Sequence, residues 1–281
     1  LLLLTVFRLL YWVPMHTDLA KFTNKRNRAK QLSLIEATAI FLGAVLPLLA
    51  GWIITNYSYD FLFLLAILIY LSALMPMITL PRTRERFSWS YWETWKIFLS
   101  RQRRRATIAY MADGAESIVS IIIWPIFIWE LLLGNYFQVG ALTALIVIIT
   151  VILQLFVGKL TDVGGKNRLL RLSSPLYALG WILKIFVVTA FQIFVVSTYH
   201  GLVRLFIRTS FDTLFYEDSA DRGHYVDEYT VLHEMAIQLG KILMLLIVLA
   251  LTIWFGLSST FILAALSVFL FNLLSNQSKE K

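Results

Sequence analysis

Long apolar stretches separated by short polar segments follow one another along the whole chain. A membrane-spanning helix needs about 20 mostly apolar residues, with a range of roughly 17–25. The runs Phe61 to Leu74 and Ile242 to Leu251 are continuous rather than alternating, which favours helices over barrel strands. The pattern predicts nine membrane-spanning helices, over residues 1–15, 33–54, 61–80, 107–129, 139–157, 172–189, 193–211, 231–253 and 258–275.

The composition supports a membrane protein. Of the 281 residues, 59% are hydrophobic and 15% are charged, whereas a soluble domain has roughly 45–50% apolar and about 25% charged residues. A soluble fold cannot bury so much hydrocarbon, so we expect an all-α polytopic membrane protein. The chain has no Cys, which excludes disulfides and thiolate chemistry. It opens Leu-Leu-Leu-Leu-Thr without Met, so we expect a fragment that begins inside the first span.

The basic residues alternate with the predicted spans. Nearly all of the 25 Lys and Arg residues lie in the segments 21–30, 82–105, 158–171 and 204–222 and in the C-terminal tail. The opposite turns, near 55–60, 130–138, 190–192 and 254–259, have none. Basic loops are retained on the cytoplasmic side of a membrane. The pattern therefore predicts a multi-pass protein of the plasma (inner) membrane with a cytoplasmic C-terminus.

The segment 81–106 is charged but also rich in aromatic residues. Phe87, Tyr91, Trp95 and Phe98 fall at i, i+4, i+8 and i+11, on one face of a helix. We expect an amphipathic helix on the cytoplasmic leaflet that links residues 1–80 to residues 107–281. Contact with the bilayer explains these rings, so no nucleic-acid partner is expected.

An internal similarity indicates two related halves. Residues 33–46 align without gaps on residues 230–243, and Gly43 is matched by Gly240. Both segments follow a basic loop and are predicted to run outward. With three spans before the linker and six after it, a repeat predicts a parent of six plus six helices.

Residues 158–169 read Gly-Lys-Leu-Thr-Asp-Val-Gly-Gly-Lys-Asn-Arg-Leu. They resemble the cytoplasmic signature loop of the major facilitator superfamily of transporters, with matches at Gly158, Leu160, Asp162, Gly165 and Lys166. Val163 and Asn167 stand where that pattern has basic residues. The resemblance implies a major-facilitator-type helical bundle in which the nine spans are helices 4–12, with an incomplete first half and a complete six-helix second half. It also implies that the loop stabilises one conformation.

Ionisable side chains inside spans cost about 2.5–3.5 kcal/mol on insertion scales and usually face a cavity. Asp113 and Glu116 share one face of their predicted helix, since they are three residues apart. His200, Arg204 and Arg208 follow at four-residue steps on an oppositely directed span. We therefore expect Arg204 near the depth of Asp113, and His200 near that of Glu116.

Two interpretations of this set remain open. One is that Glu116, Arg204, Asp113 and His200 bind a polar substrate, couple a proton, or both. The other is a structural ion pair, with Arg208 reaching toward the cytoplasm. The resemblance places both helices around a central cavity, together with the span 1–15 that carries Arg8. Lys184 and Lys241 fall on helices expected to be supporting.

Prolines within spans are candidate hinges, because proline removes a helical hydrogen bond. Pro125, which follows Trp124, and Pro14 are the two positions that we single out.

The resulting functional hypothesis is a secondary active transporter that moves a small molecule by alternating access, coupled to protons. The sequence has no Gly-x4-Gly-Lys-Ser/Thr loop for ATP. We expect no enzyme activity, no cofactor, no metal and no oligomer, with the lipid bilayer and a substrate of unknown identity as partners. A membrane-embedded enzyme acting on lipid-linked substrates, or a transporter-like receptor without flux, are the alternatives.

Overall fold

The structure is a computed structural model, and it describes residues 6, 10, 11, 28–79, 88–157, 166–220 and 226–277. Within these residues every regular element is a helix, and no strand is present. The expected all-α class is therefore confirmed for the described part of the chain. Most of the predicted span 1–15, including Arg8 and Pro14, lies outside the described residues, as do residues 80–87 at the start of the linker.

Five helices are long and apolar enough to cross a membrane. They are Tyr59–Ile78, Arg104–Leu131, Tyr136–Leu153, Ala190–Asp212 and Glu228–Phe255, and two shorter apolar helices cover Phe41–Asn56 and Ser259–Ser275. The predicted span 172–189 is helical over most of its length, but its helix carries Lys166, Arg168, Arg171 and Lys184. These helices indicate an integral membrane protein.

The chain divides into two compact units. The first comprises Leu1–Arg86 and Leu132–Ile148. Its described helices are α2 (Arg28–Asn56), α3 (Tyr59–Ile78) and the first part of α7 (Tyr136–Val157). The second unit comprises Phe87–Leu131 and Ile149–Lys281.

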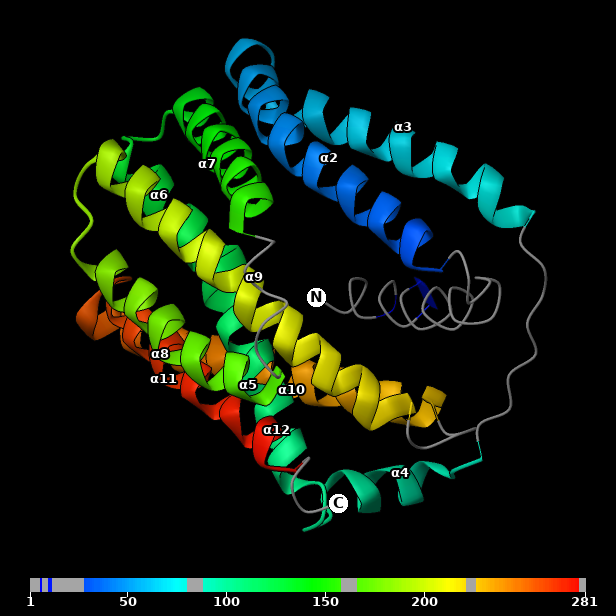
Figure 1. Ribbon diagram of the computed structural model, residues 1–281. Coiled ribbons are helices and arrows are strands. Elements are labelled where there is room, and N and C mark those ends of the chain that lie inside the picture. Colours follow the sequence, from blue (N-terminus) through cyan, green and yellow to red (C-terminus); the bar gives the residue numbers. More distant parts are fainter. Residues whose placement is uncertain are drawn as a thin grey trace. The chain divides into compact units, whose positions relative to one another are not determined.

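The second unit holds most of the described elements. They are α4 (Tyr91–Phe98), α5 (Arg104–Ile118), the π-helix η1 (Val119–Ile123), α6 (Trp124–Leu131), the end of α7, α8 (Lys166–Ile185), α9 (Ala190–Ala220), α10 (Val226–Phe255), α11 (Ser259–Leu270) and α12 (Asn272–Gln277). Helix α5 packs against α10 and α11, and α8 packs against α9 and α11 (Figure 1).

In the first unit, helix α3 begins sharply at its N-cap. The Ser58 hydroxyl accepts a hydrogen bond from the Phe61 N–H at 3.2 Å, which satisfies one of the unpaired donors of the first turn. No residue of α3 is buried, although its composition is strongly apolar. A helix of this kind is stable where its sides face lipid.

Helices α2 and α7 approach each other closely within this unit. A Cβ atom on Gly51 would collide with the Tyr136 carbonyl oxygen, and one on Gly140 would collide with the Pro47 carbonyl oxygen. The two glycines therefore permit a backbone-to-backbone contact that larger residues would prevent, as is common between membrane helices.

In the second unit, α5 and α10 cross in the same way. A Cβ atom on Gly114 would collide with the Ile237 carbonyl, and one on Gly240 with the Met111 carbonyl. Gly43 aligns with Gly240 in the internal repeat, but a Cβ atom there would meet no other atom within 4 Å among the described residues. The two aligned glycines thus differ in their packing.

In the described part of the linker, residues 88–106, the short helix α4 precedes the first turn of α5. The Ser90 side chain accepts from the Glu93 N–H, and the Glu93 carboxylate accepts from the Ser90 N–H, so a capping box begins the helix. Along the expected aromatic stripe, Phe98 is 3% exposed and Tyr91 is 68% exposed. Among the described positions of the stripe, only its C-terminal end is buried.

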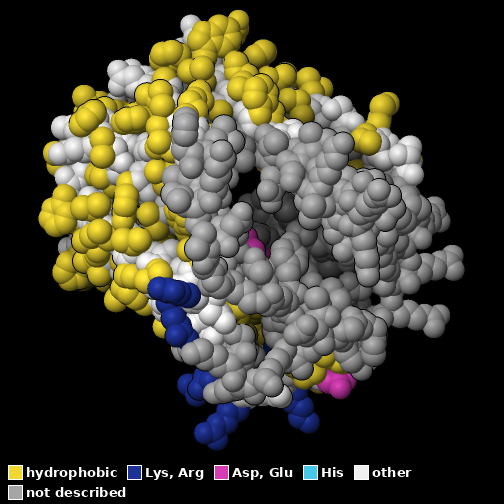
Figure 2. All heavy atoms as spheres, viewed as in Figure 1, with side chains coloured by type: hydrophobic (Ala, Val, Ile, Leu, Met, Phe, Trp, Pro, Cys, Tyr) yellow, Lys and Arg dark blue, Asp and Glu magenta, His cyan; other side chains and the backbone are white. Residues whose placement is uncertain are grey.

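Charged and apolar side chains are segregated on the surface. In Figure 2 hydrophobic side chains make up most of the described surface in view, whereas Lys and Arg side chains are grouped together. In the second unit, exposed cations lie on α4 and at or near the starts of α5 and α8, at Lys96, Arg101, Arg104, Arg105, Arg168 and Arg171. This segregation agrees with a charged membrane boundary on the side where α5 and α8 begin.

Candidate functional site

A carboxylate is buried in the middle of the second unit. Glu116, on α5, has no exposed surface, and the Tyr177 hydroxyl of α8 donates a hydrogen bond to its Oε1 at 2.8 Å. Its Oε2 has no hydrogen-bond partner among the described residues. A buried carboxyl group is costly unless it has hydrogen-bond partners, and the structure shows one such partner for Glu116 among the described residues.

His200, on α9, lies directly beside this pair. Its ring stacks on Tyr177 with centroids 4.2 Å apart, and the Trp181 ring meets it edge-on at 4.8 Å. Gly180 makes room for the imidazole, because a Cβ atom there would lie 2.7 Å from His200 Cδ2. The imidazole is 5% exposed, and its Nε2 has no hydrogen-bond partner in the described part of the chain.

A lysine completes the core of the cluster. Lys184, on α8, is 2% exposed, and its Nζ lies 3.7 Å from the centre of the Trp181 ring and 4.5 Å from that of Trp124. Two ring faces stabilise an ammonium group that has been removed from water. The charge of Glu116 also acts on this ammonium group.

An ion pair lies about one turn before Glu116 on α5 and about two turns after His200 on α9. Arg208 Nη1 donates to Asp113 Oδ2 at 3.1 Å, and a second contact joins Arg208 Nη2 to Asp113 Oδ1. The sequence pattern predicts Arg204 at the depth of Asp113, so the observed pairing is offset by one turn. Arg204 is half-buried and lies on α9 between His200 and Arg208, four residues from each.

The structure thus brings together four of the five predicted binding residues. Asp113, Glu116, His200 and Arg204 belong to one polar cluster in the second unit, whereas Arg8 lies outside the described residues. The cluster thus combines two carboxyl groups with the basic side chains of α8 and α9.

Sequence reasoning missed the contribution of α8. Tyr177, Trp181 and Lys184 are spaced i, i+4 and i+7, which places them on one face of that helix. The signal in the sequence is this face of polar and aromatic side chains within an otherwise apolar segment. It does not predict a site by itself, because the sequence does not indicate which helix packs against α5 and α9.

The remaining predicted positions fall near the ends of described segments. The signature-loop residues Gly158, Leu160, Asp162 and Gly165 lie outside the described residues, and Lys166 is the first residue of α8. Pro125 is the second residue of α6 and closely follows the π-helix η1. The Trp124 N–H bonds to the Val119 carbonyl, five residues back.

Pro125 accounts for the irregular turn. It has no N–H for the Ile121 carbonyl four residues earlier, so the regular α-helical ladder is interrupted there. The structure locates this interruption next to the predicted hinge, and the hinge itself remains a prediction.

In the described part of the chain, no group of three His, Cys, Asp or Glu side chains is arranged to hold a metal ion. The chain matches no protein-family model and no curated protein sequence.

Proposed function

We propose that this protein is a secondary active transporter that moves a polar or anionic small molecule by alternating access, coupled to protons. The observation that carries the proposal is the burial of Glu116 beside Tyr177, His200 and Lys184. Glu116 and His200 lie on helices that are long and apolar enough to cross a membrane. Ionisable groups at such depth are costly, and they are typical of substrate and proton pathways.

A purely structural role explains this cluster less well. Replacing a buried ion pair by apolar residues of similar volume is often neutral or stabilising, so burying charge is a poor way to gain stability. In addition, Glu116 Oε2 and His200 Nε2 have no hydrogen-bond partner among the described residues. Polar atoms in this situation are suited to meet a proton or a substrate group in another state of the protein.

The resemblance of residues 158–169 to the major facilitator signature loop supports the same proposal. In such proteins one helical half rocks against the other around a central site. We further propose that the basic ends of α5 and α8 face the cytoplasm, that the protein resides in the plasma membrane, and that the C-terminus is cytoplasmic.

The test is a flux measurement in vesicles. The protein is reconstituted into liposomes loaded with a pH-sensitive dye, and organic anions, amino acids and sugars are applied in turn. We expect at least one solute to cause proton movement that depends on the protein. Glu116→Gln should abolish this movement, because the amide cannot exchange a proton.

Glu130→Gln serves as the matched control. It makes the same change at an exposed residue of α6, on the same continuous helix, and it should leave the solute-dependent proton movement unchanged. If Glu116→Gln retained full proton-coupled flux, the assigned role of Glu116 would be wrong. If the wild type moved none of the solutes, with or without a pH gradient, the transport proposal would fail.

A further inference from the structure

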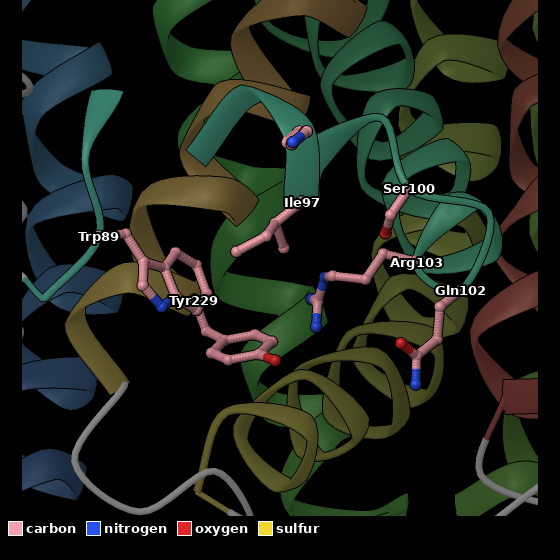
Figure 3. Close-up of a pocket in the computed structure, with 7 residues that line it drawn as sticks. Trp89, Ile97, Ser100, Gln102, Arg103 and Tyr229 are labelled. Carbon is pink, nitrogen blue, oxygen red and sulfur yellow. The ribbon is translucent and has the colours of Figure 1, made fainter. Parts of the chain in front are cut away.

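A pocket outside the buried cluster lies between α4, the turn after it and the start of α10. Its volume is about 340 Å³, and it is lined by Trp89, Lys96, Ile97, Ser100, Gln102, Arg103 and Tyr229. Figure 3 shows Trp89 and Tyr229 on one side, Ser100 and Gln102 on the other, and Arg103 between them. Arg103 precedes α5, whereas Asp113 lies about 15 Å further along that helix at 1.5 Å per residue.

The lining is rich in hydrogen-bond donors and carries positive charge. Lys96 and Arg103 are cationic, and Ser100 and Gln102 add a hydroxyl and an amide. Among the described residues, no carboxylate lines the pocket. The neighbouring Glu228 is 4% exposed, and its carboxylate accepts the Ser88 N–H at 2.8 Å. Lys96 and Arg103 therefore give the described lining a positive charge, with the Glu228 carboxylate beside it.

The central cation is held in place by its surroundings. Arg103 is 6% exposed, and its guanidinium carbon lies 4.2 Å from the centre of the Tyr229 ring. Trp89 packs against that ring edge-on, with centroids 5.5 Å apart. Because the aromatic pair fixes the guanidinium, the pocket is a formed site rather than a group of flexible surface lysines.

The position of the pocket indicates where the anion comes from. On α4 and directly after it, Tyr91, Trp92 and Leu99 are 68%, 77% and 74% exposed. Exposed aromatic and apolar side chains beside basic residues are typical of helices that lie in the headgroup region of a membrane. Lipid phosphates occupy that depth.

We propose that this pocket binds a phosphate-bearing anion, and that the anion is the headgroup of an anionic phospholipid beside α4. Arg and Lys bind phosphate oxygens through charge-assisted hydrogen bonds, and the hydroxyl and amide on the far wall supply further donors. The inference does not depend on transport, since none of these residues belongs to the buried cluster.

The test measures lipid binding by native mass spectrometry. The protein in neutral detergent is titrated with phosphatidylglycerol, phosphatidylcholine or inorganic phosphate. We expect a preference for phosphatidylglycerol over phosphatidylcholine. Lys96→Gln should weaken phosphatidylglycerol binding about fivefold, as expected for one cation near a lipid phosphate, and Arg103→Gln should weaken it about tenfold.

Arg101→Gln is the matched control. It removes one exposed cation close to the pocket without touching its lining, so it should leave binding unchanged. Arg103 is buried, so its replacement can disturb folding. Lys96→Gln, at an exposed position, therefore decides whether the pocket binds phosphatidylglycerol. An equal loss from Arg101→Gln would identify general charge attraction and overturn the site. Binding of inorganic phosphate without any preference for phosphatidylglycerol would overturn the lipid source.

Discussion

Lys184 and Glu116 are an amine and a carboxyl group within one buried cluster, yet their side chains contact different neighbours. Tyr177 donates to Glu116, and the ammonium group of Lys184 contacts the faces of Trp181 and Trp124. Each of these buried groups has a neutral aromatic partner. In the proposed transporter, that partner would keep contact with the group while the group exchanges its other partners, as coupled binding requires.

Lys184→Met should separate function from stability. Methionine keeps the volume and its sulfur contacts the same rings, while the cost of burying a charge disappears, so the thermal unfolding midpoint should stay equal or rise. Solute-coupled proton flux should fall about tenfold, which corresponds to about 1.4 kcal/mol. Lys241→Met, on α10, is the control and should retain flux. Parallel losses of stability and flux would instead indicate a structural lysine.

The Asp113–Arg208 pair is suited to a double-mutant cycle. Asp113→Asn and Arg208→Gln should each lower the free energy of unfolding by about 3 kcal/mol, because each leaves a largely buried charge without its partner. The double variant should lose less than the sum, with a coupling of about 1–3 kcal/mol. Chemical denaturation in detergent gives all four values. Strict additivity would show that the two residues do not interact.

At the scale of single residues, the sequence predicted the helix face of a side chain better than it predicted the residue that the side chain contacts. The spacing of Asp113 and Glu116 placed both on one face, and both are buried. Asp113 pairs with Arg208, one turn beyond the Arg204 that was expected at its depth, since helix tilt and axial offset come from packing rather than from the sequence of either helix. Lys184 was expected on a supporting helix for the same reason.

At the scale of helices, close crossings depend on glycines whose missing side chains admit a neighbouring backbone. Gly114 and Gly240 form such a contact between α5 and α10. This contact fixes α5, which carries both carboxylates of the cluster, against the helix with which it packs most extensively. Its geometry therefore controls where Asp113 and Glu116 stand relative to α8 and α9.

Gly114→Ala should destabilise the protein by about 1–3 kcal/mol, because the added methyl group collides with the Ile237 carbonyl and forces the helices apart. Gly43→Ala is the matched control. With open space around that position, it should be neutral or gain up to about 1 kcal/mol from helix propensity. Thermal unfolding in detergent measures both. A Gly114→Ala variant as stable as wild type would mean that the crossing tolerates separation.

At the scale of the whole molecule, the apolar runs predicted the helices correctly over most of the described residues. The segments from 33–54 to 258–275 are helical over most of their lengths, with ends that differ by several residues from those predicted. Length and composition support five helices as membrane spans. Helix α9 continues to Ala220 and α10 to Phe255, because hydropathy marks where a helix is apolar and not where its hydrogen bonding ends.

The orientation of the protein can be tested directly, since the chain has no Cys. A single cysteine at Leu133, which is 95% exposed in the turn after α6, should react with a membrane-impermeant maleimide in intact cells. A single cysteine at Arg101, at the basic end of α5, should react only after the membrane is opened. The reverse pattern would invert the proposed topology.

The π-helix η1 has a consequence for the angular register of the helix that contains it. In an unbroken α-helix, successive residues are about 100° apart, so Trp124, eight residues after Glu116, would lie about 80° around the axis from it. A π turn takes up roughly one additional residue, which reduces this angle to about 20°. The irregular turn therefore acts as an inserted residue that rotates Trp124 onto the same side as Glu116. A carboxylate and a ring on one helix can thus both face Lys184 on α8.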